Sequence, residues 1–416
     1  MHSTKPISTT LFILAGLLIF CSACERFIPP PLQGKYYVKL FGGREPDQGA
    51  DVIPLPNQQG FLLLGTTNSL GGSDADILLL QTDLEGNQTS EFNLNLGVDQ
   101  GRSLSANPDG SGFYIGASTL QNDNQDAWVS SLDWNSSNPN WSQVLGSPEG
   151  MESIVQVYAT SDQHLLVLGS STQVDPNKNG GNGQATTGDI ADIWLVKLND
   201  QGQLLWEKRY GFNGFDAGVS IQEYAGEYYL LATTDFPAPS PQAQVPLLIR
   251  LNSEGNIIDR LVLEHGGSQL LPASFAIEPN GDWVILSTSF DGLAQTNLQK
   301  VSRDLKNVNE ISLPQTDNWA EARKLIQLPN NEGYMIGALQ RSLSGAPADI
   351  IVRRHAGDGS LQWENRFGYT GADEFGGIIW LGDESFLLSG TLEFANDNTM
   401  ACLIRTQQDA SGNVGP

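Results

Sequence analysis

The feature that most constrains this chain is one sequence unit that recurs along most of its length. The clearest copy runs from Tyr210 to Leu261 and contains four short apolar runs, separated by turn residues such as Ala225-Gly226 and Glu254-Gly255-Asn256. Short apolar runs between turn signals are typical of β-strands. A sheet of four such strands cannot bury both of its faces alone, so it needs neighbours of its own kind.

Copies of this unit open about every 50 residues, a period typical of propeller blades and too long for single-helix or horseshoe repeats. No part of the body shows sustained helical periodicity. The fifth copy is the most degraded, and misreading it would change the count to six or eight. Seven copies are recognised, at Leu40, Leu96, Leu145, Tyr210, about Leu263, around Asn330 and at Phe367.

The two ends of the body complement each other. The seventh copy lacks a fourth strand, whereas the segment Lys35 to Lys39 precedes the first copy without a place in it. Pairing that segment with the last copy would remove two open sheet edges, which otherwise invite aggregation. We therefore predict an all-β fold, a seven-bladed β-propeller of four-stranded antiparallel blades closed by the N-terminal strand, over a single domain at 35–416.

The first residues predict export. An apolar run from Leu11 to Phe20 follows Lys5 and is too short for a stable membrane span. The pair Ser22-Ala23 before Cys24 resembles a bacterial lipobox, with Cys21 where leucine is usual. The resemblance implies a signal peptide at 1–23, lipid on Cys24 and a bacterial envelope location, at the outer membrane or cell surface. An ordinary signal peptide cut nearby is the alternative. Residues 24–34, with three consecutive prolines, predict an extended tether.

The chain carries 47 acidic and 22 basic residues, a formal net charge of −25. Such a charge disfavours nucleic acid and anionic lipid headgroups as partners. The need to keep an exported protein soluble explains most of this negative charge. The more specific alternative is an acidic face that binds divalent cations or a basic partner.

The predicted blades bring many acidic residues to one rim, where the loops between blades lie. We expect a binding rim there, formed by Asp47, Asp99, Asp216 and Asp373 with the aromatic residues Trp319 and Trp380. The alternative role for each aspartate is to accept backbone N–H groups in a turn, repeated because each blade poses the same problem. Trp141, Trp206 and Trp363 recur at the fourth strand and are expected to pack between blades.

Catalysis on this fold would need two carboxylates close together near the axis. Only Asp51 is acidic among the matching positions of the innermost strands, and Glu152 and Glu374 could complete a site with it. No other sequence feature distinguishes these three carboxylates from ordinary charged residues at the mouth of the channel. The matching positions are assigned as Asp51, Ser103, Ser153, Ser220, Ser274, Lys324 and Gly376.

One loop stands outside the repeat and begins like a calcium-binding loop. Asp175, Asn177 and Asn179 alternate before Gly180, but Thr186 stands where the bidentate glutamate belongs. Asp189 could serve only in a different geometry. The loop therefore suggests calcium as an optional cofactor, with a flexible polar insertion as the alternative.

The patterns Gly60 to Gly65, Asp192 to Leu198 and Gln201 to Trp206 resemble β-propeller repeats of surface lipoproteins from Bacteroidetes-type bacteria. The resemblance implies architecture and transfers no catalytic residue. We expect a membrane-anchored, non-catalytic binding or scaffold module with a monomeric body, whose partner is an envelope or extracellular protein or a glycan. A carbohydrate-active enzyme and a calcium-dependent adhesion module are the alternatives.

Overall fold

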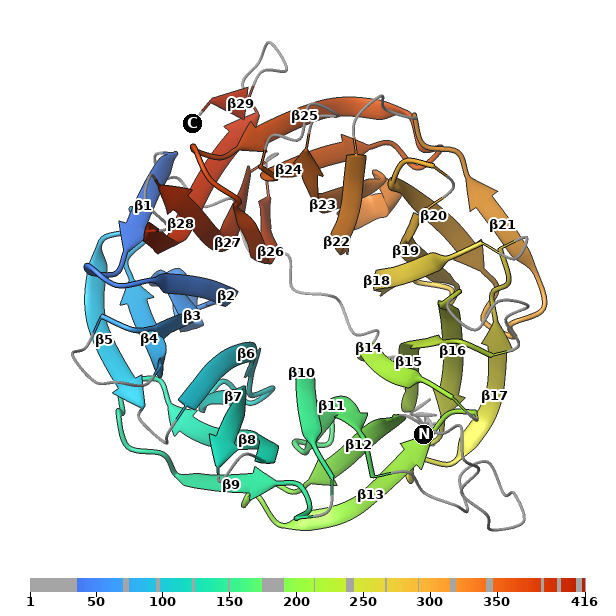
Figure 1. The fold of residues 1–416 in the computed structure, drawn as a ribbon, viewed down its shortest axis with the longest axis horizontal. Helices are drawn as coiled ribbons and strands as arrows, with labels where there is room; N and C mark the ends of the chain where they lie inside the picture. Colours follow the sequence, from blue (N-terminus) through green and yellow to red (C-terminus); the bar gives the residue numbers. More distant parts are fainter. Residues whose placement is uncertain are drawn as a thin grey trace, which may run out of the picture.

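Seven antiparallel sheets stand around a central axis in the computed structural model (Figure 1). The model describes residues 36–415 except 70–74, 95–97, 122–123, 149, 174–190, 213, 237–242, 266–267, 291, 315–318, 342–346, 383–384, 395–397 and 409–413. Helical structure in these residues is limited to two short 3₁₀ turns, Pro56–Gln58 and Pro329–Asn331. None of the described residues forms a helix long and apolar enough to cross a membrane. The predicted all-β seven-bladed propeller is confirmed.

Each blade runs from an innermost to an outermost strand in chain order. Blades 1 to 3 comprise β2 (Asp47–Pro54), β3 (Phe61–Thr67), β4 (Asp76–Thr82), β5 (Gln88–Leu94); β6 (Val98–Ala106), β7 (Gly112–Gln121), β8 (Asn124–Asp133), β9 (Trp141–Leu145); and β10 (Glu152–Ala159), β11 (Leu165–Ser171), β12 (Asp192–Leu198), β13 (Leu204–Tyr210). Blades 4 to 6 comprise β14 (Asp216–Tyr224), β15 (Glu227–Thr234), β16 (Val245–Leu251), β17 (Ile257–Val262); β18 (Leu270–Ile277), β19 (Trp283–Ser289), β20 (Gln295–Val301), β21 (Val308–Ile311); and β22 (Trp319–Gln327), β23 (Tyr334–Arg341), β24 (Asp349–His355), β25 (Leu361–Phe367).

Blade 7 is assembled from both ends of the chain. Its strands β26 (Glu374–Gly382), β27 (Ser385–Phe394) and β28 (Asn398–Gln408) are completed by β1 (Tyr37–Phe41), which pairs antiparallel with β28. Leu40 lies opposite Cys402 in this pairing. The short strand β29 (Val414–Gly415) also pairs with the far end of β28. The predicted closure by the N-terminal strand is therefore confirmed.

The core consists of apolar clusters between neighbouring blades. All seven residues of β3 and all seven of β4 are buried, because sheets cover both of their faces. Leu62 and Leu64 of blade 1, for example, share a cluster with Ile115 of blade 2. The outermost strand β5 instead alternates exposed and partly buried residues, as a strand with one solvated face should.

An aromatic side chain on the outermost strand of one blade meets a turn glycine of the next. A Cβ added to Gly202 would lie 2.6 Å from the ring of Trp141, and one added to Gly86 would lie 2.5 Å from Tyr37. Trp206 contacts Gly255 in the same way. The expected packing of these tryptophans between blades is confirmed, and Tyr37 on β1 takes the same place in blade 7.

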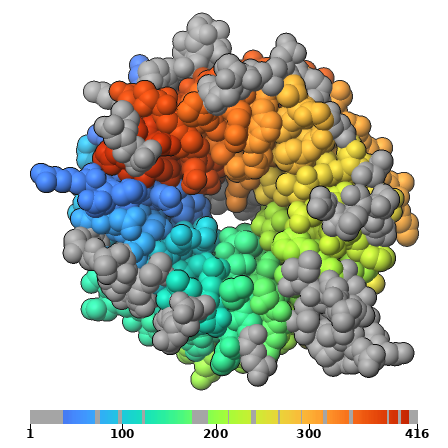
Figure 2. Space-filling model, in the orientation of Figure 1, coloured from blue at the N-terminus to red at the C-terminus, as the bar shows by residue number. Residues whose placement is uncertain are grey.

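The ring has two faces. We call the face where the innermost strands begin the linker face, because the connections between blades reach it there. The opposite face, where the innermost strands end, carries the turns from first to second and from third to fourth strand, and we call it the turn face. A space-filling view shows that the molecule is hollowed at its centre (Figure 2).

Candidate functional site at the central channel

The innermost strands line the channel, and each contains a β-bulge that interrupts its pairing. A bulge leaves its extra residue unpaired and redirects the neighbouring side chains. In blade 2 the bulged Arg102 is exposed, while Gly101 and Ser103 beside it are buried. The bulged residues are Ala50, Arg102, Val155, Val219, Ala273, Arg323 and the pair Gly376-Gly377.

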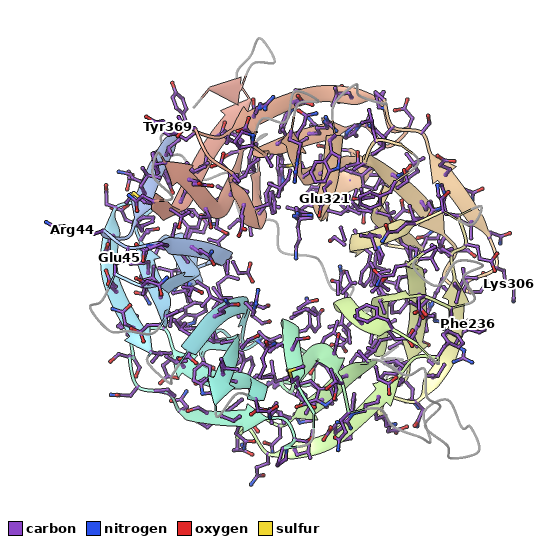
Figure 3. The ribbon with its side chains drawn as sticks, viewed as in Figure 1. Arg44, Glu45, Phe236, Lys306, Glu321 and Tyr369 are labelled. Carbon is purple, nitrogen blue, oxygen red and sulfur yellow. The ribbon has the colours of Figure 1, made fainter. Side chains whose placement is uncertain are left out.

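Charge is distributed unevenly around this channel. The channel-lining positions of blades 1, 2, 6 and 7 carry all of its ionisable side chains, and Figure 3 places one of them, Glu321, at the inner edge of the ring. The equivalent positions of blades 3 to 5 carry no ionisable side chain, for example Val155 and Ala217. The charged set consists of Asp51, Arg102, Glu321, Arg323, Lys324 and Glu374.

These charges interact both within one strand and across blade boundaries. Arg323 forms an ion pair with Glu321 on the same strand. Arg102 of blade 2 lies within electrostatic reach of Glu374 in blade 7, which opposes the lowering of the Arg102 pKa by burial. The channel of this acidic protein is therefore a mixed site in which three basic side chains offset its carboxylates.

Asp51 has a structural role in the channel wall. Its two carboxylate oxygens accept hydrogen bonds from the backbone N–H groups of Val52 and of Leu104 in blade 2, both at 2.9 Å. Burial raises the pKa of the Asp51 carboxyl, and Lys324 opposes that rise. Gly377 of blade 7 lies against Asp51, since a Cβ added there would be 2.7 Å from its carboxylate. Asp51 thus joins blade 1 to blade 2.

The carboxylates suggested for catalysis are not brought together as a set. Glu152 is fully buried in blade 3, two blades from Asp51, and accepts hydrogen bonds from Ser147 N at 3.0 Å and Ser171 Oγ at 2.6 Å. A pairing of Glu152 with Asp51 was wrong, because Glu152 begins its strand as a turn acceptor. Glu374 is exposed at the start of β26, in the blade next to Asp51.

Two of the seven matching positions also need correction. In blade 3 Glu152 takes the place of Asp47, so Gln156 and not Ser153 is equivalent to Asp51. In blade 7 the register shift between Phe375 and Ile378 makes Gly377, and not Gly376, the equivalent residue. Gln156 works as Asp51 does, since its side-chain oxygen accepts the Ile221 N–H of the next blade at 2.8 Å.

The aspartates expected on the binding rim lie beneath the linker face. Asp47, Asp99 and Asp216 are fully buried and Asp373 is 1% exposed. Asp47, for example, accepts the Gly43 N–H at 2.7 Å. The structure therefore corresponds to the turn-acceptor alternative for Asp47, Asp216 and Asp373. Because all four aspartates are buried, a partner at this rim would contact other side chains.

The two tryptophans assigned to the rim lie at opposite ends of their strands. Trp319 begins β22 at the linker face, and the Arg341 guanidinium lies 4.1 Å from its ring centroid. Trp380 lies near the end of β26, opposite Phe386, and therefore toward the turn face. Its placement on the rim was wrong, because the position along an innermost strand decides which face a residue reaches.

The lipidation residue Cys24 and the calcium candidates Asp175, Asn177, Asn179 and Asp189 lie outside the described residues. Within the described residues, no group of three or more His, Cys, Asp or Glu side chains could hold a metal ion. Arg102 was missed by the sequence reasoning, although a basic residue directly after the glycine of an innermost strand is a signal visible in the sequence.

Comparisons with known proteins agree on the fold. No protein-family model and no curated protein matches the sequence. The structure is similar to hydrazine synthase of Kuenenia stuttgartiensis, with TM-score 0.55 and 10% identity over 85% of this chain and 94% of that one. It is also similar to a Dyadobacter fermentans protein of unknown function (0.50, 11%, 88% and 97%) and to the Pseudomonas aeruginosa periplasmic gluconolactonase PpgL (0.50, 12%, 78% and 85%). At such identities the likeness shows the propeller fold alone.

Proposed function

We propose that this protein is an exported, lipid-anchored propeller that binds an envelope or extracellular protein or glycan and performs no chemistry of its own. The apolar run from Leu11 to Phe20, the lipobox-like residues before Cys24 and the proline-rich tether support the anchoring. Several acyl chains on one cysteine hold a protein firmly to a bilayer, since each buried CH₂ contributes about 0.8 kcal/mol.

The observation that carries the proposal is the use of the candidate carboxylates as structural acceptors. Asp51 holds two backbone N–H groups and Glu152 holds a backbone N–H and a hydroxyl. A glycosidase needs one carboxyl to donate a proton and a second to attack or to activate water. Carboxylates whose oxygens already accept hydrogen bonds within the fold are better suited to holding strands together than to forming a catalytic pair.

A partner would find its contacts at the linker-face mouth of the channel. Gln48, Gln100 and Glu374 begin three neighbouring innermost strands there and are exposed, and Arg102 stands close to Gln100. Exposed amides and charges of both signs suit a polar partner whose charge complements the mouth.

Site-specific cross-linking in living cells would test this function. A photoreactive amino acid in place of Gln100 should give a defined adduct, because Gln100 lies at the mouth. The same amino acid in place of Lys306, which lies at the outer edge of the ring (Figure 3), serves as the control. Equal adducts at both positions, or none at either together with turnover of a polymer by the purified protein, would refute the proposal.

Anchoring has its own test. Cells grown with an alkyne-tagged fatty acid should label the protein, and Cys24→Ser should abolish the label and release the protein from the membrane fraction. Labelling that persists in Cys24→Ser would show that the anchor is elsewhere.

A further inference from the structure

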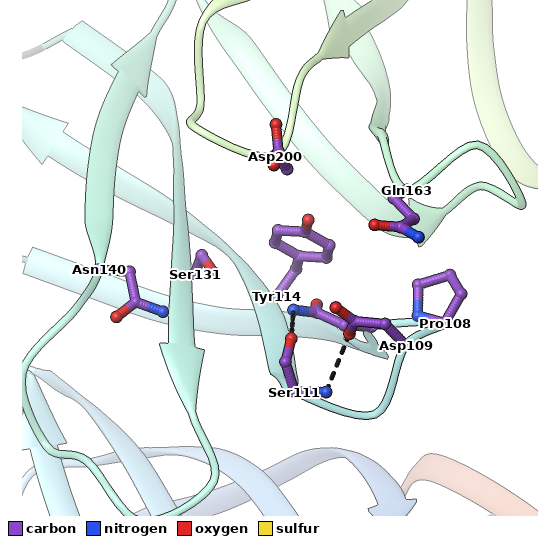
Figure 4. A pocket seen from close by; sticks show the side chains of 9 residues that line it. Pro108, Asp109, Ser111, Tyr114, Ser131, Asn140, Gln163 and Asp200 are labelled. Carbon is purple, nitrogen blue, oxygen red and sulfur yellow. Dashed lines mark hydrogen bonds between the residues drawn. The ribbon is translucent and has the colours of Figure 1, made fainter.

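A polar pocket opens on the turn face between blades 2 and 3, away from the linker-face mouth (Figure 4). It holds about 150 Å³ of space. One water needs about 10–15 Å³ on the same measure, so the pocket has room for roughly ten water-sized groups, about one hexose ring with its hydroxyls. Its wall includes Tyr114, Ser131, Asp109, Asn140, Gln163 and Asp200.

Two hydroxyl groups of largely buried residues reach this pocket. Tyr114 is 3% exposed and Ser131 is 4% exposed, and they lie opposite each other on β7 and β8. The Tyr114 hydroxyl points into the space below Asp200 (Figure 4). Within the described part of the chain, neither side-chain hydroxyl has a hydrogen-bond partner, and both residues line the open space of the pocket. A polar ligand or water in that space can therefore hydrogen-bond to them.

The Tyr114 hydroxyl is a permanent donor at neutral pH. Burial, with a further contribution from the Asp200 and Asp109 carboxylates, raises the pKa of Tyr114 to about 12. The Asp109 carboxylate accepts the Ser111 N–H at 2.9 Å, and this hydrogen bonding holds the pKa of Asp109 below its usual value. The pocket thus presents a neutral donor beside an ionised acceptor.

The pocket wall is held in place before any ligand arrives. The indole N–H of Trp141 donates to the backbone oxygen of Asp200 at 2.7 Å, which fixes the turn of blade 3 against blade 2. The rings of Trp141 and Tyr114 are in contact, with centroids 5.9 Å apart. A ligand would therefore meet groups whose positions are already set, which lowers the cost of binding.

The chemistry of the wall selects among ligand classes. Asp109 and Asp200 disfavour an anion, while a metal ion would leave the donors of Tyr114, Asn140 and Gln163 unused. A sugar offers several adjacent hydroxyls, each able both to donate and to accept a hydrogen bond. Carboxylate acceptors, amide groups and hydroxyl donors in one small pocket match that pattern.

We propose that the pocket between blades 2 and 3 binds one uncharged sugar residue of a glycan, through the Tyr114 and Ser131 hydroxyls and the side chains of Asp109, Asn140 and Asp200. This inference goes beyond the proposed function, since it adds a glycan site on the turn face that is separate from the linker-face mouth.

The test is saturation-transfer NMR on the full-length protein in detergent, with free glucose, galactose, mannose and N-acetylglucosamine as probes. At least one should bind saturably to the unaltered protein. Tyr114→Phe removes only the hydroxyl and should weaken that binding about three- to tenfold, the usual effect of losing one hydrogen bond. Ser131→Ala should act in the same direction.

Tyr229→Phe is the matched control. Tyr229 is the equivalent residue of blade 4, buried at the same register opposite the innermost strand, and this variant should bind as the unaltered protein does. No saturable binding of any of the four sugars, or equal binding by Tyr114→Phe and the unaltered protein, would overturn the inference. Cross-linking through Gln100 tests the proposed function separately, so the two failures are distinguishable.

Discussion

Asp373 lies almost wholly out of solvent and accepts the backbone N–H groups of Tyr369 at 3.2 Å and Glu393 at 2.9 Å. Despite these hydrogen bonds, burial raises the pKa of its carboxyl to about 6, and the Asp349 and Glu393 carboxylates add to the rise. The folded protein therefore holds a proton at this site that the unfolded chain releases near pH 4. Asp373 therefore connects the stability of the ring to pH.

The sign of this effect can be measured. Because the folded-state pKa is the higher one, Asp373 contributes stability below about pH 4, and this stability is lost as pH rises to about 6. The loss should be about 2–3 kcal/mol, from roughly two pKa units at 1.36 kcal/mol each. Asp373→Asn keeps a carbonyl acceptor and cannot ionise, so urea unfolding should show a smaller loss over the same interval. Identical pH profiles for both proteins would contradict this role.

Asp51 provides a second test at this scale. Asp51→Ala leaves the N–H groups of Val52 and Leu104 without their acceptor and should lower the free energy of unfolding by about 1–3 kcal/mol. Glu374→Gln, at an exposed position, should change it by less than about 0.5 kcal/mol. Loss of glycan hydrolysis in Asp51→Asn with unchanged stability would favour the enzyme alternative.

The sequence could indicate that one acidic residue recurs in each blade, but not which way its side chain points. Asp47 and Asp216 each follow a Gly at a fixed short distance, a pattern equally compatible with a ligand site and with a turn. Their burial depends on how tightly the next strand covers the turn. That is a tertiary contact, and it cannot be predicted from the local pattern of one sequence.

Among the elements, the turns between third and fourth strands hold neighbouring blades together. Gly202 has a φ of +77° and faces the Trp141 ring, whereas Gly226 has a φ of +76° with nothing within 4 Å of an added Cβ. The two glycines share a left-handed backbone and differ in their surroundings. Comparing them separates the cost of backbone strain from that of the contact between blades.

Gly226→Ala should cost about 1 kcal/mol, the backbone penalty for an L-residue at positive φ. Gly202→Ala should cost at least about 1 kcal/mol more, because its methyl group would displace Trp141. Thermal unfolding of both variants measures the difference. Equal losses would show that the contact between Trp141 and Gly202 adds nothing to the stability of the ring.

Strands and turns were predictable from the sequence where the pattern repeats, and bulges were not. The apolar runs of β3 and β12 and the turn at Glu254-Gly255 carry local signals. A bulge has no fixed signature in the sequence. Ser153 was assigned in place of Gln156, three residues further on, because the sequence did not show that Glu152 takes the place of Asp47 at the start of the strand. A bulge also moves side chains between the channel and the blade interior.

For the whole molecule, the blade count and the closure were predictable because seven similar units and one spare strand have few ways to bury their edges. The uneven charge of the channel and the pocket beside Tyr114 were not, because each combines residues from separate blades. Their positions follow from the packing between blades, which the repeat period does not specify.

Closure is the property on which both faces, the channel mouth and the pocket depend. Leu40 on β1 lies directly opposite Cys402, the buried free cysteine on β28. Leu40→Cys therefore places two thiols across the seam between the ends of the chain. A disulfide there would close a loop that includes nearly the whole ring, with a stabilisation of about 6 kcal/mol at the chain-entropy limit and less if the bond is strained.

The most direct measurement is oxidation of Leu40→Cys, followed by thiol titration and thermal unfolding with and without reductant. The closed ring predicts that the thiols at positions 40 and 402 disappear without dimer formation and that the oxidised protein melts at a higher temperature than the reduced one. Two thiols that stay free under oxidation, or that join separate molecules, would contradict the pairing of β1 with β28 and with it the closed propeller.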